Sequence, residues 1–91
     1  MAVEVRVPTI LRKHTGGARA VSGGGSTVRD VIDDLETRSP GLRAAIVGEG
    51  GDLHRFINIY LNDEDIRFLG TLETPVKDGD ILSILPAVAG G

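Results

Sequence analysis

A chain of 91 residues has room for one small domain, and its 41% hydrophobic share supports a core that must be aliphatic, because only 3% of the residues are aromatic. The absence of cysteine excludes disulfides, thiolate metal sites and a cysteine nucleophile, and His14 and His54 are too far apart in the sequence to form a convincing metal set. Because the net charge is −3 without a basic stripe, and no apolar run approaches the roughly 18 residues of a membrane span, we expect a soluble cytoplasmic protein with neither nucleic acid nor membrane among its partners.

The first 22 residues are predicted to form a β-hairpin. Valines at positions 3, 5 and 7 alternate with Ala2, Glu4 and Arg6, which is typical of a strand with one buried face, and Pro8 ends it. Residues 12–17 contain two glycines and are predicted to be a loop. Residues 18–22 then form the second strand of the hairpin.

A helix is predicted to follow the glycines at positions 23–25. Ser26 or Thr27 can cap its N-terminus, and Asp30 lies near the positive end of the helix dipole. Apolar residues then recur at the i, i+3, i+4 and i+7 spacing of one buried helical face: Val28, Val31, Ile32 and Leu35. Residues 39–41, Ser-Pro-Gly, end the helix, and residues 42–47 favour a short second helical turn.

The second half of the chain is predicted to supply three more strands. Residues 56–61 alternate in hydrophobicity and form the clearest strand. Residues 62–65 form a turn, and residues 66–69 a short return strand. The last strand covers residues 81–85, follows the tight turn at residues 77–80 and is closed by Pro86.

This order of elements predicts an α+β domain in which a mixed sheet packs on one main helix. Parallel pairing of the first and last strands at the centre of the sheet would make it a β-grasp. We expect a β-grasp domain over residues 1–86 and a flexible C-terminal Gly-Gly tail over residues 87–91. The side chains predicted to meet between sheet and helix are Val5, Val7, Val28, Ile32, Leu35, Ile57, Ile59, Leu61, Leu82 and Ile84.

No catalytic constellation is apparent in the sequence. Residues 23–26 precede a helix, but they lack the spacing of a phosphate-binding loop. Asp63, Glu64 and Asp65 are typical of a solvated turn, because the glycine and the distal glutamate of a calcium loop are absent. His54 could act as a base, but no serine or cysteine nucleophile motif accompanies it. We therefore expect no enzyme, no metal site and no bound cofactor.

The last residues are the exception. Pro86 is followed by Ala87, Val88, Ala89, Gly90 and Gly91, a stretch without charge and with small side chains. Two glycines without Cβ atoms can enter a narrow slot and leave the terminal carboxyl group accessible. An ordinary frayed terminus is the alternative for this segment taken alone.

Together with the expected fold, this ending resembles the ubiquitin-like sulfur-carrier family, ThiS and MoaD. Within the family the chain is most similar to the CysO type, which serves cysteine synthesis. The general resemblance rests on Asp78–Asp80, Asn62 and Leu85–Gly91, and the closer one on Val7–Arg12, His14–Gly17, Leu53–Tyr60 and Asn62–Asp65. The resemblance covers nearly the whole chain, and the helix and residues 48–52 carry it least.

The resemblance implies a chemistry centred on Gly91. An E1-like adenylating enzyme of the MoeB/ThiF type would consume ATP to adenylate the Gly91 carboxyl group, and sulfide or a persulfide would convert the adenylate to a thiocarboxylate. Gly90, Ala89, Val88 and Ala87 would form the segment that passes into partner enzymes. The sulfur would go to a PLP-dependent cysteine synthase or a thiazole-synthase-like enzyme, and a JAMM-type metallopeptidase would release cysteine from the carrier.

Two other functions share the Gly-Gly ending. One is the small subunit of molybdopterin synthase, of MoaD type, and the other is a ubiquitin-like protein modifier. Residues 53–65 favour the cysteine-synthesis carrier over the molybdopterin subunit. The Gly-Gly ending is common to all of these proteins, so it does not identify the acceptor.

A partner-docking surface is expected on the sheet face that points away from the helix. If residues 57, 59, 82 and 84 face the helix, pleating sends their neighbours to the opposite face. The predicted docking residues are Phe56, Tyr60, Ile81 and Leu85, with Arg6 and Arg67 at the rim. The alternative is that residues 42–53 fold across part of this face.

Overall fold

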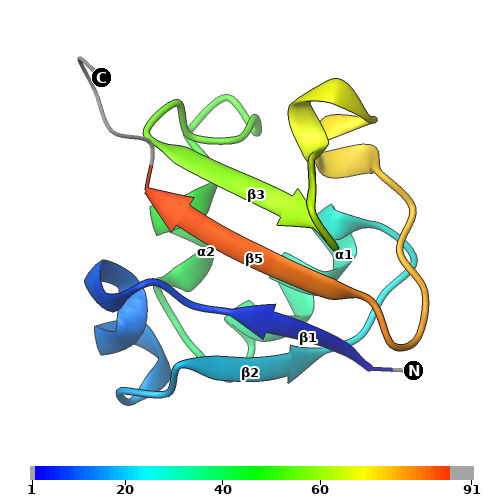
Figure 1. Ribbon diagram of the computed structural model, residues 1–91. Coiled ribbons are helices and arrows are strands. Elements are labelled where there is room, and N and C mark those ends of the chain that lie inside the picture. The colour runs from blue at the N-terminus through cyan, green and yellow to red at the C-terminus, as the bar shows by residue number, and fades with distance from the viewer. Residues whose placement is uncertain (1, 87–91) are drawn as a thin grey trace.

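The computed structural model describes residues 2–86, in which a five-stranded sheet packs against two α-helices (Figure 1). The strands are β1 (Val3–Arg6), β2 (Ala20–Gly23), β3 (Ile57–Leu61), β4 (Glu64–Asp65) and β5 (Ile81–Pro86). The α-helices are α1 (Val28–Glu36) and α2 (Leu42–Ile46). The described residues also form three 3-10 helices, η1 (Thr9–Thr15), η2 (Ile66–Phe68) and η3 (Thr71–Glu73). The predicted tail, residues 87–91, lies outside the described residues.

The sheet has the order β2-β1-β5-β3-β4, so the last strand lies at its centre (Figure 1). β5 runs parallel to β1, with Val5 opposite Leu82, and antiparallel to β3, with Ile59 opposite Ile84. β1 and β2 form the expected antiparallel hairpin. The central parallel pair confirms the predicted α+β β-grasp.

The main helix begins and packs as its sequence predicts. The Thr27 side chain accepts a hydrogen bond from the backbone N–H of Asp30 (3.2 Å) and so caps the N-terminus of α1. The four stripe residues, Val28, Val31, Ile32 and Leu35, are all buried. At the other end of the helix, the Glu36 carboxylate accepts the backbone N–H groups of Gly41 (3.0 Å) and Arg43 (2.8 Å), which fixes the start of α2.

The core lies between the sheet and the helices, and nine of the ten predicted core residues are buried there. Leu61 is only partly buried, at the end of β3. The core also includes Val3 of β1 and Val31 of α1, which lie on the predicted buried faces. It further takes in apolar residues from short helices and a loop that were not predicted to belong to it: Leu11, Leu42, Ile46, Ile66, Leu72 and Val76. The loops therefore contribute to the core together with the sheet and α1.

Two predicted elements are wrong. Residues 12–17 were expected to be a loop, but η1 extends to Thr15. The Leu11 side chain of η1 is buried in the core, and Gly16 ends the helix at φ 65°. Residues 66–69 were expected to pair with β3, but only Glu64–Asp65 does so. Ile66 is fully buried, which turns the chain inward, and the Asp65 side chain accepts the Arg67 backbone N–H (2.9 Å) to cap η2.

A polar clamp fixes the entry to β5. Asn62 adopts a left-handed conformation (φ 56°), its side-chain oxygen accepts the Ile81 N–H (3.0 Å), and its amide donates to Asp80 (3.2 Å). The buried Asp80 carboxylate also accepts the backbone N–H of Lys77 (2.9 Å). The hydrogen bonds from Lys77 and Asn62 hold the pKa of Asp80 below its usual value.

Asp80→Ala should lower the free energy of unfolding by about 1–3 kcal/mol at pH 7, because two donors lose a charged acceptor. The folded-state pKa of Asp80 lies below the unfolded one, so the stabilisation is complete above the unfolded value of about 4 and is lost as the pH falls through the folded value. Urea midpoints of both proteins at pH 7 and pH 2.5 check this. Asp63→Ala is the matched control, because Asp63 is an exposed acid next to Asn62 in the sequence. A loss of stability in Asp80→Ala that persists unchanged at pH 2.5 contradicts the clamp.

Candidate functional site

The central strand leads directly toward the predicted tail. β5 pairs with β3 from Leu82 up to Pro86, which lies opposite Ile57, whereas β1 pairs only with the first half of β5, Ile81–Ser83. The last described residue, Pro86, is therefore held at one end of the sheet (Figure 1). The predicted attachment site, Gly91, and the predicted passage residues Gly90, Ala89, Val88 and Ala87 lie outside the described residues.

The sheet face opposite the helices is open. Ile59, Leu82 and Ile84 are buried toward α1, so pleating sends Tyr60, Ile81 and Leu85 to the other face. Tyr60 and Ile81 are partly buried and Leu85 is 46% exposed. These three residues form the apolar patch. Figure 1 views the sheet from this face, with both α-helices behind it.

Residues 42–53 do not cover the patch. Leu42 and Ile46 of α2 are fully buried in the core on the helix side of the sheet. The following loop bends back toward α1, where Arg29 donates to the carbonyl oxygen of Gly51 (2.9 Å). The alternative in which this segment folds across the open face is therefore wrong.

Phe56 lies in the turn before β3 rather than in the strand itself. Its ring is 46% exposed, with its centroid 5.5 Å from that of the His54 ring and 5.0 Å from the Arg55 guanidinium carbon. Its backbone N–H donates to Nδ1 of His54 (3.2 Å). His54 thus serves as a turn-stabilising acceptor in this structure.

The two predicted rim arginines differ in their surroundings. Arg6, on β1, is exposed on the open face and pairs with Glu4 (2.8 Å). Arg67 donates to the Asn58 side chain and to the backbone carbonyl oxygens of His54 (3.2 Å) and Ile57 (2.9 Å). Its guanidinium group therefore ties the turn before β3 to η2.

A basic groove adjoins the patch and was not predicted. It has a volume of about 590 Å³, and its lining includes Glu4, Arg6, Pro8, Arg12, Arg19 and Leu85. The three arginines come from β1, η1 and the residue before β2. The only sequence signal for the groove was the charge of residues 1–29, which hold five basic residues against a single acid.

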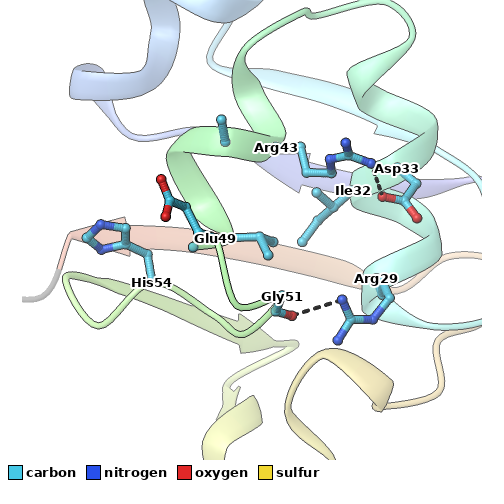
Figure 2. Close-up of a pocket in the computed structure, with 10 residues that line it drawn as sticks. Arg29, Ile32, Asp33, Arg43, Glu49, Gly51 and His54 are labelled. Carbon is cyan, nitrogen blue, oxygen red and sulfur yellow. Dashed lines mark hydrogen bonds and ion pairs between the residues drawn. The ribbon is translucent and has the colours of Figure 1, made fainter.

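A second pocket, of about 710 Å³, lies on the helix side of the sheet (Figure 2). Its floor includes Ile32, and Arg43 pairs with Asp33 (3.1 Å) at its wall. Arg29 donates to Gly51 and also pairs with Glu73 (2.6 Å). Both arginines of this pocket are thus already engaged by acceptors of the protein.

Within residues 2–86 no group of three or more histidine or acidic side chains is arranged to hold a metal ion. The acids at positions 63–65 instead belong to the β3–β4 turn and β4. Among the same residues, neither α-helix has the length and apolar character needed to cross a membrane. What distinguishes the described surface is therefore an open apolar sheet face, a basic groove beside it and a central strand that leads to the Gly-Gly end.

Comparison with known proteins identifies the family. The ThiS family matches residues 5–91. The chain belongs to the ThiS family. It is 54% identical to the sulfur carrier protein CysO of Mycobacterium tuberculosis over an alignment of 93 residues that covers all of both chains.

Solved structures of similar proteins share the fold of this ThiS-family chain. One is the CysO-like chain in the crystal structure of the Amycolatopsis orientalis BexX/CysO complex, with 61% identity, a TM-score of 0.92 and coverage of 99% of this chain and all of that one. Another is the small archaeal modifier protein 1 of Methanosarcina acetivorans, with 35% identity, a TM-score of 0.83 and coverage of 99% and 96%.

Proposed function

We propose that this chain is a sulfur carrier protein of the CysO type, and that the α-carboxyl group of Gly91 is the atom group that carries sulfur. The observation that supports this most directly is the 54% identity to a sulfur carrier over the full chain. The fold supports it as well, because the central strand β5 leads from the core toward the Gly-Gly end. The family match also extends to Gly91.

The proposed chemistry begins with activation of a poor electrophile. The terminal carboxyl group is ionised at pH 7, since its ordinary pKa is about 3.3–3.7. An E1-like adenylating enzyme of the MoeB/ThiF type attaches this carboxylate to the α-phosphate of ATP and releases pyrophosphate. Sulfide then attacks the acyl carbon, AMP leaves with the former carboxyl oxygen, and a thiocarboxylate remains on Gly91.

The carrier is a co-substrate in this scheme and supplies no catalytic side chain. The acceptor is a PLP-dependent cysteine synthase, or a thiazole-synthase-like enzyme in a related pathway. A JAMM-type metallopeptidase releases cysteine when the acceptor leaves it joined to Gly91. We place all of these steps in the cytoplasm. The activating enzyme, and not the carrier, binds the ATP.

Conjugation to other proteins is the second candidate function. It is favoured by the 35% identity to a small archaeal modifier protein of the same fold. Both functions use an activated Gly91, so they differ only in the nucleophile that takes it. An amine would give an isopeptide bond to a protein, whereas sulfide gives the thiocarboxylate.

Intact-mass spectrometry tests the proposed function. The purified chain is incubated with the E1-like enzyme of its own source, ATP and sulfide. The carrier should gain the mass of one oxygen-to-sulfur exchange, localised to Gly91 by fragmentation. Failure to gain that mass with its own activating enzyme would overturn the sulfur-carrier proposal, and high-mass conjugates in lysate would favour the modifier.

The apolar patch is proposed as the surface that docks on the activating enzyme. Tyr60→Ala combined with Leu85→Ala should lower kcat/KM for sulfur loading about tenfold or more, because truncation of a central interface anchor commonly costs over 1 kcal/mol. Phe68→Ala, at an aromatic side chain that is 87% exposed on η2, is the control. Loading kinetics equal to wild type, with both proteins folded, would remove the patch from the mechanism.

A further inference from the structure

Three arginines lie together in one groove of a chain whose net charge is negative. The net charge is −3, yet three guanidinium groups, those of Arg6, Arg12 and Arg19, line the basic groove. The one acid in its lining, Glu4, already pairs with Arg6. Within residues 2–86, no ion pair involves Arg12 or Arg19.

Arg12 is held in place before any ligand arrives. Its Nε donates to the carbonyl oxygen of Val7 (3.1 Å), which orients the guanidinium group. Its own carbonyl oxygen accepts the Gly17 N–H (2.8 Å) and the Thr15 hydroxyl group (3.2 Å), which fixes the backbone at the end of η1. A partly buried arginine in this position loses little freedom when it binds an anion.

The groove lies against the strand that leads to the tail. Its other wall consists of β5 residues Ser83, Ile84 and Leu85, so it adjoins both the apolar patch and the end of the sheet where Pro86 stands. The open face is therefore basic at the end of the sheet where Pro86 lies.

We propose that the basic groove binds an acidic segment of the E1-like adenylating enzyme and thereby sets the orientation in which the carrier docks. This inference rests on the proposed function and adds the chemistry of the partner surface. An apolar patch holds a partner without defining its rotation on the sheet, whereas charge pairs at one edge favour a single orientation and penalise its reverse. That orientation directs the end of β5, and with it Gly91, to one side of the complex.

Charge reversal at Arg19 tests the groove. Arg19 is exposed and donates no side-chain hydrogen bond within residues 2–86, so Arg19→Glu should leave the fold intact. It should lower kcat/KM for sulfur loading about tenfold at low ionic strength, mainly by slowing association. The double variant Arg12→Gln with Arg19→Gln should show the same direction of change. The defect should shrink as salt is raised, because screening shortens the range of the attraction.

Lys13→Glu is the matched control. It makes the same change in net charge on an exposed residue of η1, the 3-10 helix that contains Arg12, but it does not line the groove. It should retain most of the wild-type rate. Affinities for the purified activating enzyme, measured by isothermal titration calorimetry without ATP, should rank the variants in the same order.

The outcomes separate the two proposals. If wild type gains sulfur and Arg19→Glu matches it in rate, affinity and salt dependence, the groove inference is wrong and the carrier function stands. The same holds if Lys13→Glu is as defective as Arg19→Glu, since net charge alone would then explain the effect. If wild type never gains sulfur, the proposed function fails and the groove inference fails with it.

Discussion

Adding one glycine after Gly91 should abolish sulfur loading while leaving the fold unchanged. The extra residue moves the terminal carboxyl group by about 3.5 Å, and a misplacement of about 1 Å can already cost 10²-fold in rate. The change lies beyond Pro86, and every residue of the described core precedes Pro86 in the sequence. Intact-mass spectrometry after incubation with the activating enzyme, ATP and sulfide measures the loss.

Gly90→Val should have the same effect for a different reason. It adds a branched side chain where backbone must pass close to an enzyme wall, and it removes any positive φ that the bound tail adopts. One residue added before Met1 is the matched control for both variants, since it lengthens the chain without moving the carboxyl group. Equal sulfur gain by the extended protein and by wild type would refute the assignment to Gly91.

Local patterns in the sequence were sufficient to predict the main elements of the fold. Alternating valines predicted β1 because one face of the sheet is buried, and the spacing of Val28 and Leu35 placed α1 on that same face. The Thr27 cap was predictable because the side chain that accepts the hydrogen bond lies three residues from its donor. The open sheet face followed from pleating once the buried face was known.

Tertiary contacts decided the elements that were predicted wrongly. Residues 66–69 were predicted to form a return strand after the turn, but Ile66 is buried in the core, which takes the chain off the sheet edge into η2. Residues 12–17 have a loop-like composition, but Leu11 anchors η1 to the core. In both cases the burial of a single apolar residue in the core determines the local structure, and no local sequence pattern predicts that burial.

The basic groove could not be derived from spacing. Arg6, Arg12 and Arg19 are separated along the chain and lie on three different elements, so only the folded hairpin brings them to one place. The positive excess of residues 1–29 gave the sign of the charge but not its position. The residues of the apolar patch, by contrast, follow the two-residue alternation of their own strands, so the patch could be predicted from the sequence.

Leu35→Ala and Ile59→Ala should each lower the free energy of unfolding by about 2–5 kcal/mol, through lost apolar burial and the cavity left behind. Each side chain is 1% exposed, one on α1 and one on β3, so together they sample both layers of the core. In a domain whose total stability is about 5–15 kcal/mol, either change consumes a large share of it. Urea denaturation followed by circular dichroism gives the midpoints.

Ile10→Ala is the control for these core variants, because the Ile10 side chain is 59% exposed on η1 and its truncation should change stability by less than about 0.5 kcal/mol. Leu61→Ala should fall between the two classes, since Leu61 packs against the core only in part. The order of the four midpoints thus tests the packing of α1 on the sheet independently of any partner. Midpoints for Leu35→Ala and Ile59→Ala that equal wild type would mean that these side chains do not meet in the core, and the register that exposes Tyr60 and Leu85 on the opposite face would fall with it.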